Sequence, residues 1–170
     1  MGTVEIRLAA DRDEPGVLAA LAGLFSEDPG TRDPTVSQDW PRLQGPSAAA
    51  AWRADGSRLV LAAADGDTVV GMLTGYLTEP SDYRPVRVAV LHSLYVQPAH
   101  RDAGVGTRLV GAFRSWARER RADRMSVTAY AANADAIRFY QRHGFTPREL
   151  ELDGRPAARP AVLAKQKRRT

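Results

Sequence analysis

Residues 94–107 have the sequence LYVQPAHRDAGVGT, and this stretch decides the fold. A short apolar segment ends at Pro98, a turn containing Gly104 and Gly106 follows, and the apolar spacing then becomes helical. Glycines leave backbone N–H groups open to a ligand, and the first turn of a helix carries partial positive charge. The stretch therefore predicts a strand, a glycine turn and a helix start that together hold an anionic group such as a phosphate.

Length and composition predict a single domain over residues 1–170, with a basic C-terminal end at 166–170 that we expect to be mobile. The sequence has no cysteine, which excludes disulfides, thiolate metal sites and a cysteine nucleophile, and we expect no metal. No segment approaches the roughly 20 apolar residues of a membrane span, and no secretory leader pattern opens the chain. These features predict a cytoplasmic protein without membrane contact.

The net charge of +4 is unevenly distributed. Six basic residues follow Gly154, where there is no acid, so residues 1–154 carry 18 basic and 20 acidic groups. A basic tail can bind nucleic acid or an acidic partner, but a charged chain end is more often a solvated terminus. The charge pattern therefore does not favour a nucleic-acid-binding protein.

The order of apolar patterns predicts an α+β fold, with an antiparallel start and a βαβ unit at the glycine turn. Strands are expected at Val4–Leu8, Leu59–Ala64, Thr68–Leu77, Val86–Val96, Arg124–Tyr130, Arg148–Leu152 and Ala161–Ala164. Helices are expected from Pro15 through Phe25, over Ser37–Ala54 with interruptions at Pro41, Gly45 and Pro46, over 107–120, and over Asn133–His143. Trp52 and Trp116 are expected in the core.

Two separated motifs resemble one enzyme family. The residues that carry the resemblance are Val96, Pro98, Arg101, Gly104 and Gly106, then Asn133, then Phe139, Tyr140, His143, Gly144 and Phe145. Together they resemble the GNAT superfamily of acyl-CoA-dependent N-acetyltransferases. The resemblance implies a mixed, mostly antiparallel, twisted sheet of about seven strands, with helices on both faces and a central βαβ unit. It also implies acetyl-CoA as cosubstrate and is compatible with a homodimer.

The resemblance assigns the acetyl-CoA site to the strand, the turn and one distant asparagine. The strand would pair with the pantetheine arm, and the turn would hold the pyrophosphate. The implied residues are Leu94, Tyr95, Val96, Arg101, Asp102, Ala103, Gly104, Val105, Gly106, Thr107, Asn133 and Tyr140. Asn133 can instead, or as well, cap the following helix. Asp102 departs from the family pattern, which often has Gly, Arg or Gln at this position. A carboxylate near phosphates is unfavourable unless it points to solvent or caps the helix.

Two side chains are candidates for catalysis. Tyr140 matches the general acid of the family, which protonates the leaving thiolate, although it can also be a packing aromatic beside Phe139. His92 can accept the proton of an ammonium group near neutral pH. The segment 91–94 resembles arylalkylamine N-acetyltransferases, which have two histidines on this strand, but the first position here is Val90. A hydrogen-bonded core histidine, with a water chain as base, is the alternative.

The acceptor is expected to bind to the segments between the first strand and the hairpin. Carboxylates there would attract an amine, or they only solvate the surface. The candidates are Glu27, Asp28, Asp33, Asp39 and Trp40, with Glu79 and Asp82 as weaker ones.

These residues predict an N-acetyltransferase that moves the acetyl group of acetyl-CoA directly to a primary amine of a small molecule. Direct transfer in a ternary complex follows from the absence of cysteine. Transfer to a protein N-terminus or a lysine is an alternative within the same class. A non-catalytic acyl-CoA-binding module is the alternative from another class, and an interaction role led by the basic tail is a third.

Overall fold

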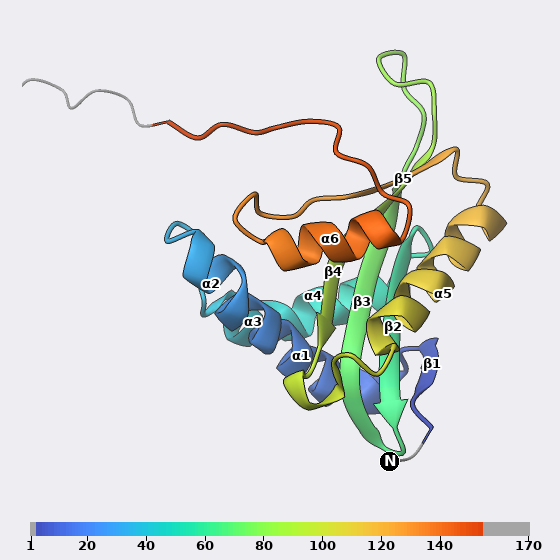
Figure 1. Ribbon diagram of the computed structural model, residues 1–170. Helices are drawn as coiled ribbons and strands as arrows, with labels where there is room; N and C mark the ends of the chain where they lie inside the picture. Colours follow the sequence, from blue (N-terminus) through green and yellow to red (C-terminus); the bar gives the residue numbers. More distant parts are fainter. Residues whose placement is uncertain (1–2, 155–170) are drawn as a thin grey trace, which may run out of the picture.

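The computed structural model describes residues 3–154 of the 170-residue chain (Figure 1). The strands are β1 (Glu5–Leu8), β2 (Arg58–Asp65), β3 (Thr68–Thr78), β4 (Val88–Val96) and β5 (Arg124–Val127). The helices are α1 (Glu14–Glu27), α2 (Pro29–Arg32), α3 (Trp40–Leu43), α4 (Gly45–Ala54), α5 (Val105–Glu119) and α6 (Ala134–Arg142), with short 3₁₀ turns at Asp11–Asp13 and Pro98–His100. No helix within residues 3–154 is long and apolar enough to cross a membrane.

The strands form one sheet in the order β1-β2-β3-β4-β5. Three neighbouring pairs are antiparallel, and only β4 and β5 run parallel, joined by α5. The Asp65-Gly66-Asp67 turn between β2 and β3 has Gly66 at a φ of 60°, as the predicted hairpin requires. The mixed, mostly antiparallel sheet with a βαβ unit is thus confirmed.

The predicted number of about seven strands is wrong for the described residues, which contain five. Arg148–Leu152 alternates like a strand but forms none, and Leu150 and Leu152 are 73% and 83% exposed. An alternating pattern forms a stable strand only when a partner strand and a core cover it. The other two predictions, the strand Ala161–Ala164 and the mobile end 166–170, lie outside the described residues. As a result, the βαβ unit lies at one edge of the described sheet and not at its centre.

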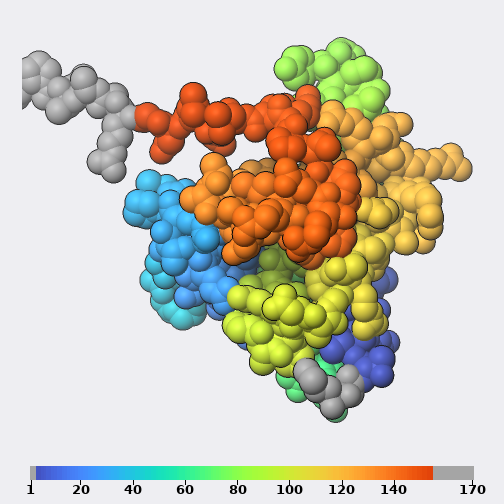
Figure 2. All heavy atoms as spheres, viewed as in Figure 1, coloured from blue at the N-terminus to red at the C-terminus, as the bar shows by residue number. Residues whose placement is uncertain are grey.

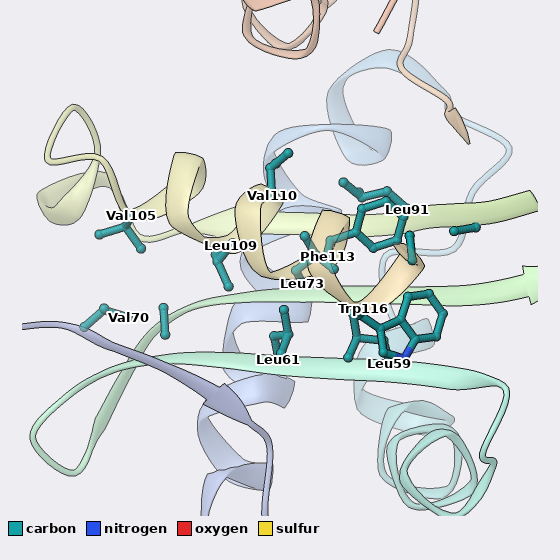
Figure 3. Close-up of a cluster of buried hydrophobic side chains, with 13 residues drawn as sticks. Leu59, Leu61, Val70, Leu73, Leu91, Val105, Leu109, Val110, Phe113 and Trp116 are labelled. Atoms are coloured by element: carbon teal, nitrogen blue, oxygen red, sulfur yellow. The ribbon is translucent and has the colours of Figure 1, made fainter. Parts of the chain in front are cut away.

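Helices cover both faces of the sheet, as predicted. On one face, Phe113 and Trp116 of α5 pack against side chains from β2, β3 and β4, including Leu61 and Leu91 (Figure 3). On the other face, Leu21 of α1 packs with Met72 of β3 and its neighbours. Trp116 is in the core, as expected.

The prolines of the 37–54 segment begin helices and do not interrupt one. Pro41 and Pro46 lie in the first turns of α3 and α4. A proline fits there, because the N–H groups of the first turn have no partner within the helix. The predicted interrupted helix is therefore two helices, divided at Gln44 beside Gly45, and both contact α1.

Asp13 joins β1 to the start of α1. Its buried carboxylate accepts hydrogen bonds from Arg7 Nη2 at 2.8 Å and from the Ala10 N–H at 2.9 Å. These two bonds, the one from Arg7 above all, hold the pKa of the Asp13 carboxyl below its usual value of 3.8. The ion pair between Arg7 and Asp13 thus holds the start of α1 against β1, and the far end of α1 forms one wall of the candidate site.

We predict that Asp13→Asn lowers the free energy of unfolding at pH 7 by about 1 to 3 kcal/mol, because the buried charge-assisted bonds are lost. The folded-state pKa of Asp13 is depressed, so its contribution is present above the unfolded pKa and disappears as the pH falls through the folded value. Urea unfolding at pH 7 and at pH 2 to 3 measures this. Asp11→Asn, which changes a fully exposed carboxylate, is the matched control and should have no measurable effect. Equal effects of the two variants would contradict the assignment.

Candidate active site

One extra residue in β4 distorts the centre of the sheet. Leu91 lies opposite Gly75 and Ser93 lies opposite Thr74, so His92 has no partner in β3. This is a β-bulge, which bends the strand and re-aims the side chains near it. Both His92 and Ser93 line the same cavity, although strict alternation would put consecutive residues on opposite faces.

The two parallel strands separate just after the bulge. Pairing between β4 and β5 covers only Val88–Leu91 and Arg124–Val127. From Ser93 to Val96, β4 has β3 on one side and no strand of the described residues on the other. An extended ligand can therefore bind to this edge through main-chain hydrogen bonds. One acceptor on it is already engaged, since the Val96 carbonyl accepts a bond of 2.9 Å from Arg101 Nε.

The glycine turn has the backbone of an anion site. Gly104 has a φ of 77°, a conformation that favours glycine, and α5 starts at the next residue. The first N–H groups of this 15-residue helix have no acceptor inside the helix. Residues 101–104 are exposed, so the turn is open to a ligand.

Asp102 is explained by the same turn. It has a φ of 58°, and aspartate adopts this left-handed conformation more readily than most residues with a side chain. Its side chain is exposed, so the carboxylate is solvated and can point away from a bound anion. The departure from the family pattern is thus compatible with the turn.

The second sequence motif packs directly on the first. A Cβ on Gly106 would lie 3.2 Å from the ring of Phe139, so only a very small residue allows α6 to approach α5 this closely. His143 Nε2 lies 3.2 Å from the hydroxyl of Thr107. Figure 2 shows the resulting surface hollow between α6, in orange, and the turn segment, in yellow-green. The two motifs therefore lie side by side in the fold.

Asn133 caps the start of α6, which confirms one of the two roles expected for it. Its Oδ1 accepts from the Ala136 N–H at 3.1 Å, and its Nδ2 donates to Asp28 Oδ1 at 2.8 Å. The bond to Asp28 ties the end of α1 to the start of α6. Contact of Asn133 with a cofactor stays a prediction.

Tyr140 of α6 is a protonated phenol at neutral pH. Its ring contacts Phe139 and Phe145, with centroid distances of 5.4 and 5.8 Å. Burial and the nearby Asp28 carboxylate raise the pKa of Tyr140 to about 12. The hydroxyl can therefore donate a hydrogen bond or a proton.

A cavity of about 330 Å³ lies between α1, α3, α4 and β4. It is lined by Leu21, Phe25, Val36, Ser37, Trp40, Trp52, His92 and Ser93. Trp40 was predicted at the acceptor site, and it lies in this wall. Trp52 was predicted in the core, and this is wrong in part: it packs on the α1 face of the sheet but also lines the cavity.

Two aromatic rings flank His92, whose side chain is otherwise partly exposed. The ring of Trp52 lies edge-on at a centroid distance of 6.3 Å, and that of Tyr76 at 5.8 Å. Partial burial lowers the pKa of His92 below 6.5, and the charge of Arg58 lowers it further. The imidazole is therefore neutral at pH 7 and can accept a proton.

The acids that were predicted to attract an amine do not line this cavity. Most bind an arginine instead: Glu27 to Arg101 at 2.6 Å, Asp28 to Arg32 at 2.8 Å, Asp39 to Arg42 at 3.2 Å, and Glu79 to Arg87 at 2.8 Å. Asp33 accepts bonds from the N–H and the hydroxyl of Thr35. Glu27 also accepts from the Tyr95 hydroxyl of β4 at 3.0 Å, and its pair with Arg101 places it beside the glycine turn.

The comparison with protein families decides the identity. Residues 18–145 match the Acetyltransferase (GNAT) family. The chain belongs to the GNAT family of acetyltransferases. It is an acetyl-CoA-dependent acyltransferase, and the matched range contains the glycine turn, His92 and Tyr140. No curated protein sequence is similar enough to this acetyltransferase to count as a match.

Solved structures agree on the fold. A mutant of a Bacillus halodurans protein superposes with a TM-score of 0.81 at 19% identity, over 89% of this chain and 99% of that one. The aminoglycoside antibiotic 6'-N-acetyltransferase of Acinetobacter haemolyticus superposes with a TM-score of 0.71 at 20% identity, over 91% and 99%. An aminoglycoside N-acetyltransferase in complex with CoA gives 0.69 at 15% identity, over 91% and 100%.

The sequence interpretation missed Phe25, Val36, Ser37 and Trp52 as cavity residues. Phe25 and Trp52 were expected to pack, since helix aromatics usually do. The signal that could have identified Trp52 is the position of the tryptophans along the chain. Only three tryptophans are present, and two of them lie at 40 and 52.

We predict that Gly104→Val weakens CoA binding about tenfold or more, because a β-branched residue is strained at a φ of 77° and the turn must change shape. Calorimetric titration with CoA measures this. Gly111→Ala is the matched control: it lies in α5 with no atom near its added Cβ, and CoA binding should be unchanged. Unaltered CoA affinity of Gly104→Val would contradict a role of the turn in binding.

Proposed function

We propose that this acetyltransferase transfers the acetyl group of acetyl-CoA to the primary amine of a small molecule, directly and within a ternary complex. One observation carries the proposal. His92, with a depressed pKa, lies in the bulge of β4, on the wall of a cavity and next to the open strand edge. A neutral base, an acceptor cavity and an edge for an extended cosubstrate thus meet at one residue.

Acetyl-CoA supplies the activated acetyl group as a thioester. The backbone of Leu94, Tyr95 and Val96 would bind its extended arm, because this edge of β4 lacks a strand partner among the described residues. The turn from Arg101 to Thr107 would bind its pyrophosphate through N–H groups at the start of α5. The exposed turn and the left-handed Gly104 fit such an anion.

The chain's own groups move two protons. The amine attacks in its neutral form, and an acceptor that arrives as an ammonium first gives one proton to solvent. A ring nitrogen of His92 accepts the proton that the attacking nitrogen loses as the new C–N bond forms, and the imidazolium then releases it to solvent. A backbone N–H near Leu94 polarises the thioester carbonyl. The Tyr140 hydroxyl donates its proton to the sulfur as the C–S bond breaks, and solvent restores that proton. The products are an N-acetylated amine and CoA.

A small acceptor fits the cavity better than a folded protein does. The cavity volume of about 330 Å³ is near the lower end of the range of roughly 300 to 1,000 Å³ for small-molecule sites. Two of the structural neighbours named above are aminoglycoside acetyltransferases, whose acceptors are small molecules. The test is CoA release from acetyl-CoA with a panel of amines, amino acids and peptides. Turnover of peptides alone would overturn the small-molecule assignment, and tight CoA binding without any turnover would favour a binding module.

We predict that kcat/KM rises with pH along a limb whose midpoint lies below 6.5, as His92 loses its proton. His92→Gln should remove this limb and lower the rate about 100-fold. The ionisation of the acceptor amine at high pH should persist in both proteins and is the internal control. An unchanged rate and profile in His92→Gln would exclude His92 as the base.

We predict that Tyr140→Phe lowers kcat about 100-fold and leaves the affinity for CoA within a factor of about three, since the ring packing against Phe139 and Phe145 is kept. Because the pKa of Tyr140 is about 12, the wild-type profile should show no loss of rate from this group below pH 10. Steady-state kinetics and calorimetry measure the two effects. A full rate in Tyr140→Phe would assign the acid to another group.

A further inference from the structure

The wall of the acceptor cavity is aromatic. Phe25 and Trp40 stack with a centroid distance of 5.5 Å and an interplanar angle of 11°, and Trp40 continues to Trp52 at 6.3 Å and 25°. Trp52 then meets His92 edge-on. A row of rings from α1, α3 and α4 thus leads to the proposed base.

The polar groups of the wall are few and carry no negative charge. Besides His92, the polar side-chain groups of the lining are the hydroxyls of Ser37 and Ser93 and the indole N–H groups of Trp40 and Trp52, and none of its residues is an acid. A polyamine or an aminoglycoside needs several carboxylates to replace the water around its ammonium groups. This cavity offers such a ligand none.

A positive charge lies at one end of the ring row. The Arg58 guanidinium lies 5.8 Å from the ring centre of Trp52 and 5.4 Å from that of Tyr76. Its own carboxylate partner, Asp55, is also bonded to the N–H and the hydroxyl of Ser57. A second ammonium group on the acceptor would be repelled at this end of the site.

Three acids near the site are already paired. Glu27, Asp28 and Asp39 each bind an arginine, as described above. The walls of the cavity are therefore mostly apolar and offer a cation no carboxylate.

We infer that the acceptor is a monoamine whose amino group is carried by an aromatic or similarly bulky apolar group, with Trp40 and Trp52 as the specificity-determining residues. This inference rests on the proposed function. The apolar group packs against the ring row, and the amino group reaches His92. A cavity of about 330 Å³, near the lower end of the range of roughly 300 to 1,000 Å³ for small-molecule sites, suits a ligand with one ring system.

The test compares kcat/KM for 2-phenylethylamine and tryptamine with that for spermidine and kanamycin, with acetyl-CoA saturating. We expect a preference of at least 100-fold for the arylalkylamines. Trp52→Ala and Trp40→Ala should each raise the KM for 2-phenylethylamine at least tenfold and leave the KM for acetyl-CoA unchanged. Tyr83→Ala removes an aromatic ring that is 92% exposed and is the matched control, with no expected change.

A charge variant keeps the test decisive if a tryptophan variant does not fold. Ser37→Asp adds a carboxylate to the lining at an exposed position, and it should raise kcat/KM for spermidine at least fivefold while lowering that for 2-phenylethylamine. Equal or better use of spermidine or kanamycin by the wild type would overturn the inference but keep the proposed function. Turnover of none of these amines, nor of any other amine, would instead overturn the proposed function.

Discussion

Between Leu91 and Ser93, β4 contains one residue more than the strand opposite. The extra residue turns His92 and Ser93 toward the same cavity, and the pairing with β5 ends immediately before it. The strands can come apart here without loss of the core, because Leu91 still packs under α5 beside Phe113. The position of His92, the cavity and the open edge of β4 all depend on this local change of register.

A close contact holds the bulge in place. Opposite the bulge, Gly75 brings β3 so near to α5 that a Cβ would lie 2.9 Å from the ring of Phe113 and 3.0 Å from the Val90 carbonyl oxygen. A side chain at this position would push α5 or β4 away. The packing of the core on one face of the sheet therefore supports the geometry of the cavity on the other.

Local chemistry made most of the fold predictable. Glycine turns, helix caps and apolar periodicity depend on neighbouring residues, so the hairpin at Gly66, the turn at Gly104 and the cap at Asn133 were foreseen correctly. The strand expected at Arg148–Leu152 failed because its stability depends on a partner, which a local pattern does not report. The bulge is equally invisible in the sequence, since it arises from the pairing of two strands.

The site was predictable to a similar extent. Charge alone suggested that loop acids attract the acceptor, but whether a carboxylate is free depends on which arginine folds against it, as for Glu27 with Arg101. Trp52 was assigned to the core because it packs like a core residue, and only the fold shows that one side of it faces a cavity. Sequence motifs thus predict the cofactor, whereas the chemical nature of the cavity wall depends on contacts between segments that are distant in the sequence.

The ion pair between Glu27 and Arg101 has a consequence for how the two halves of the site communicate. It joins the last turn of α1 to Arg101, the residue that begins the glycine turn. The same turn of α1 also provides Phe25 to the aromatic wall. Both side chains are close to half exposed, at 44% and 42%, so dissolved ions weaken their attraction. High ionic strength therefore weakens this direct link between the aromatic wall and the glycine turn, and dilute buffer strengthens it.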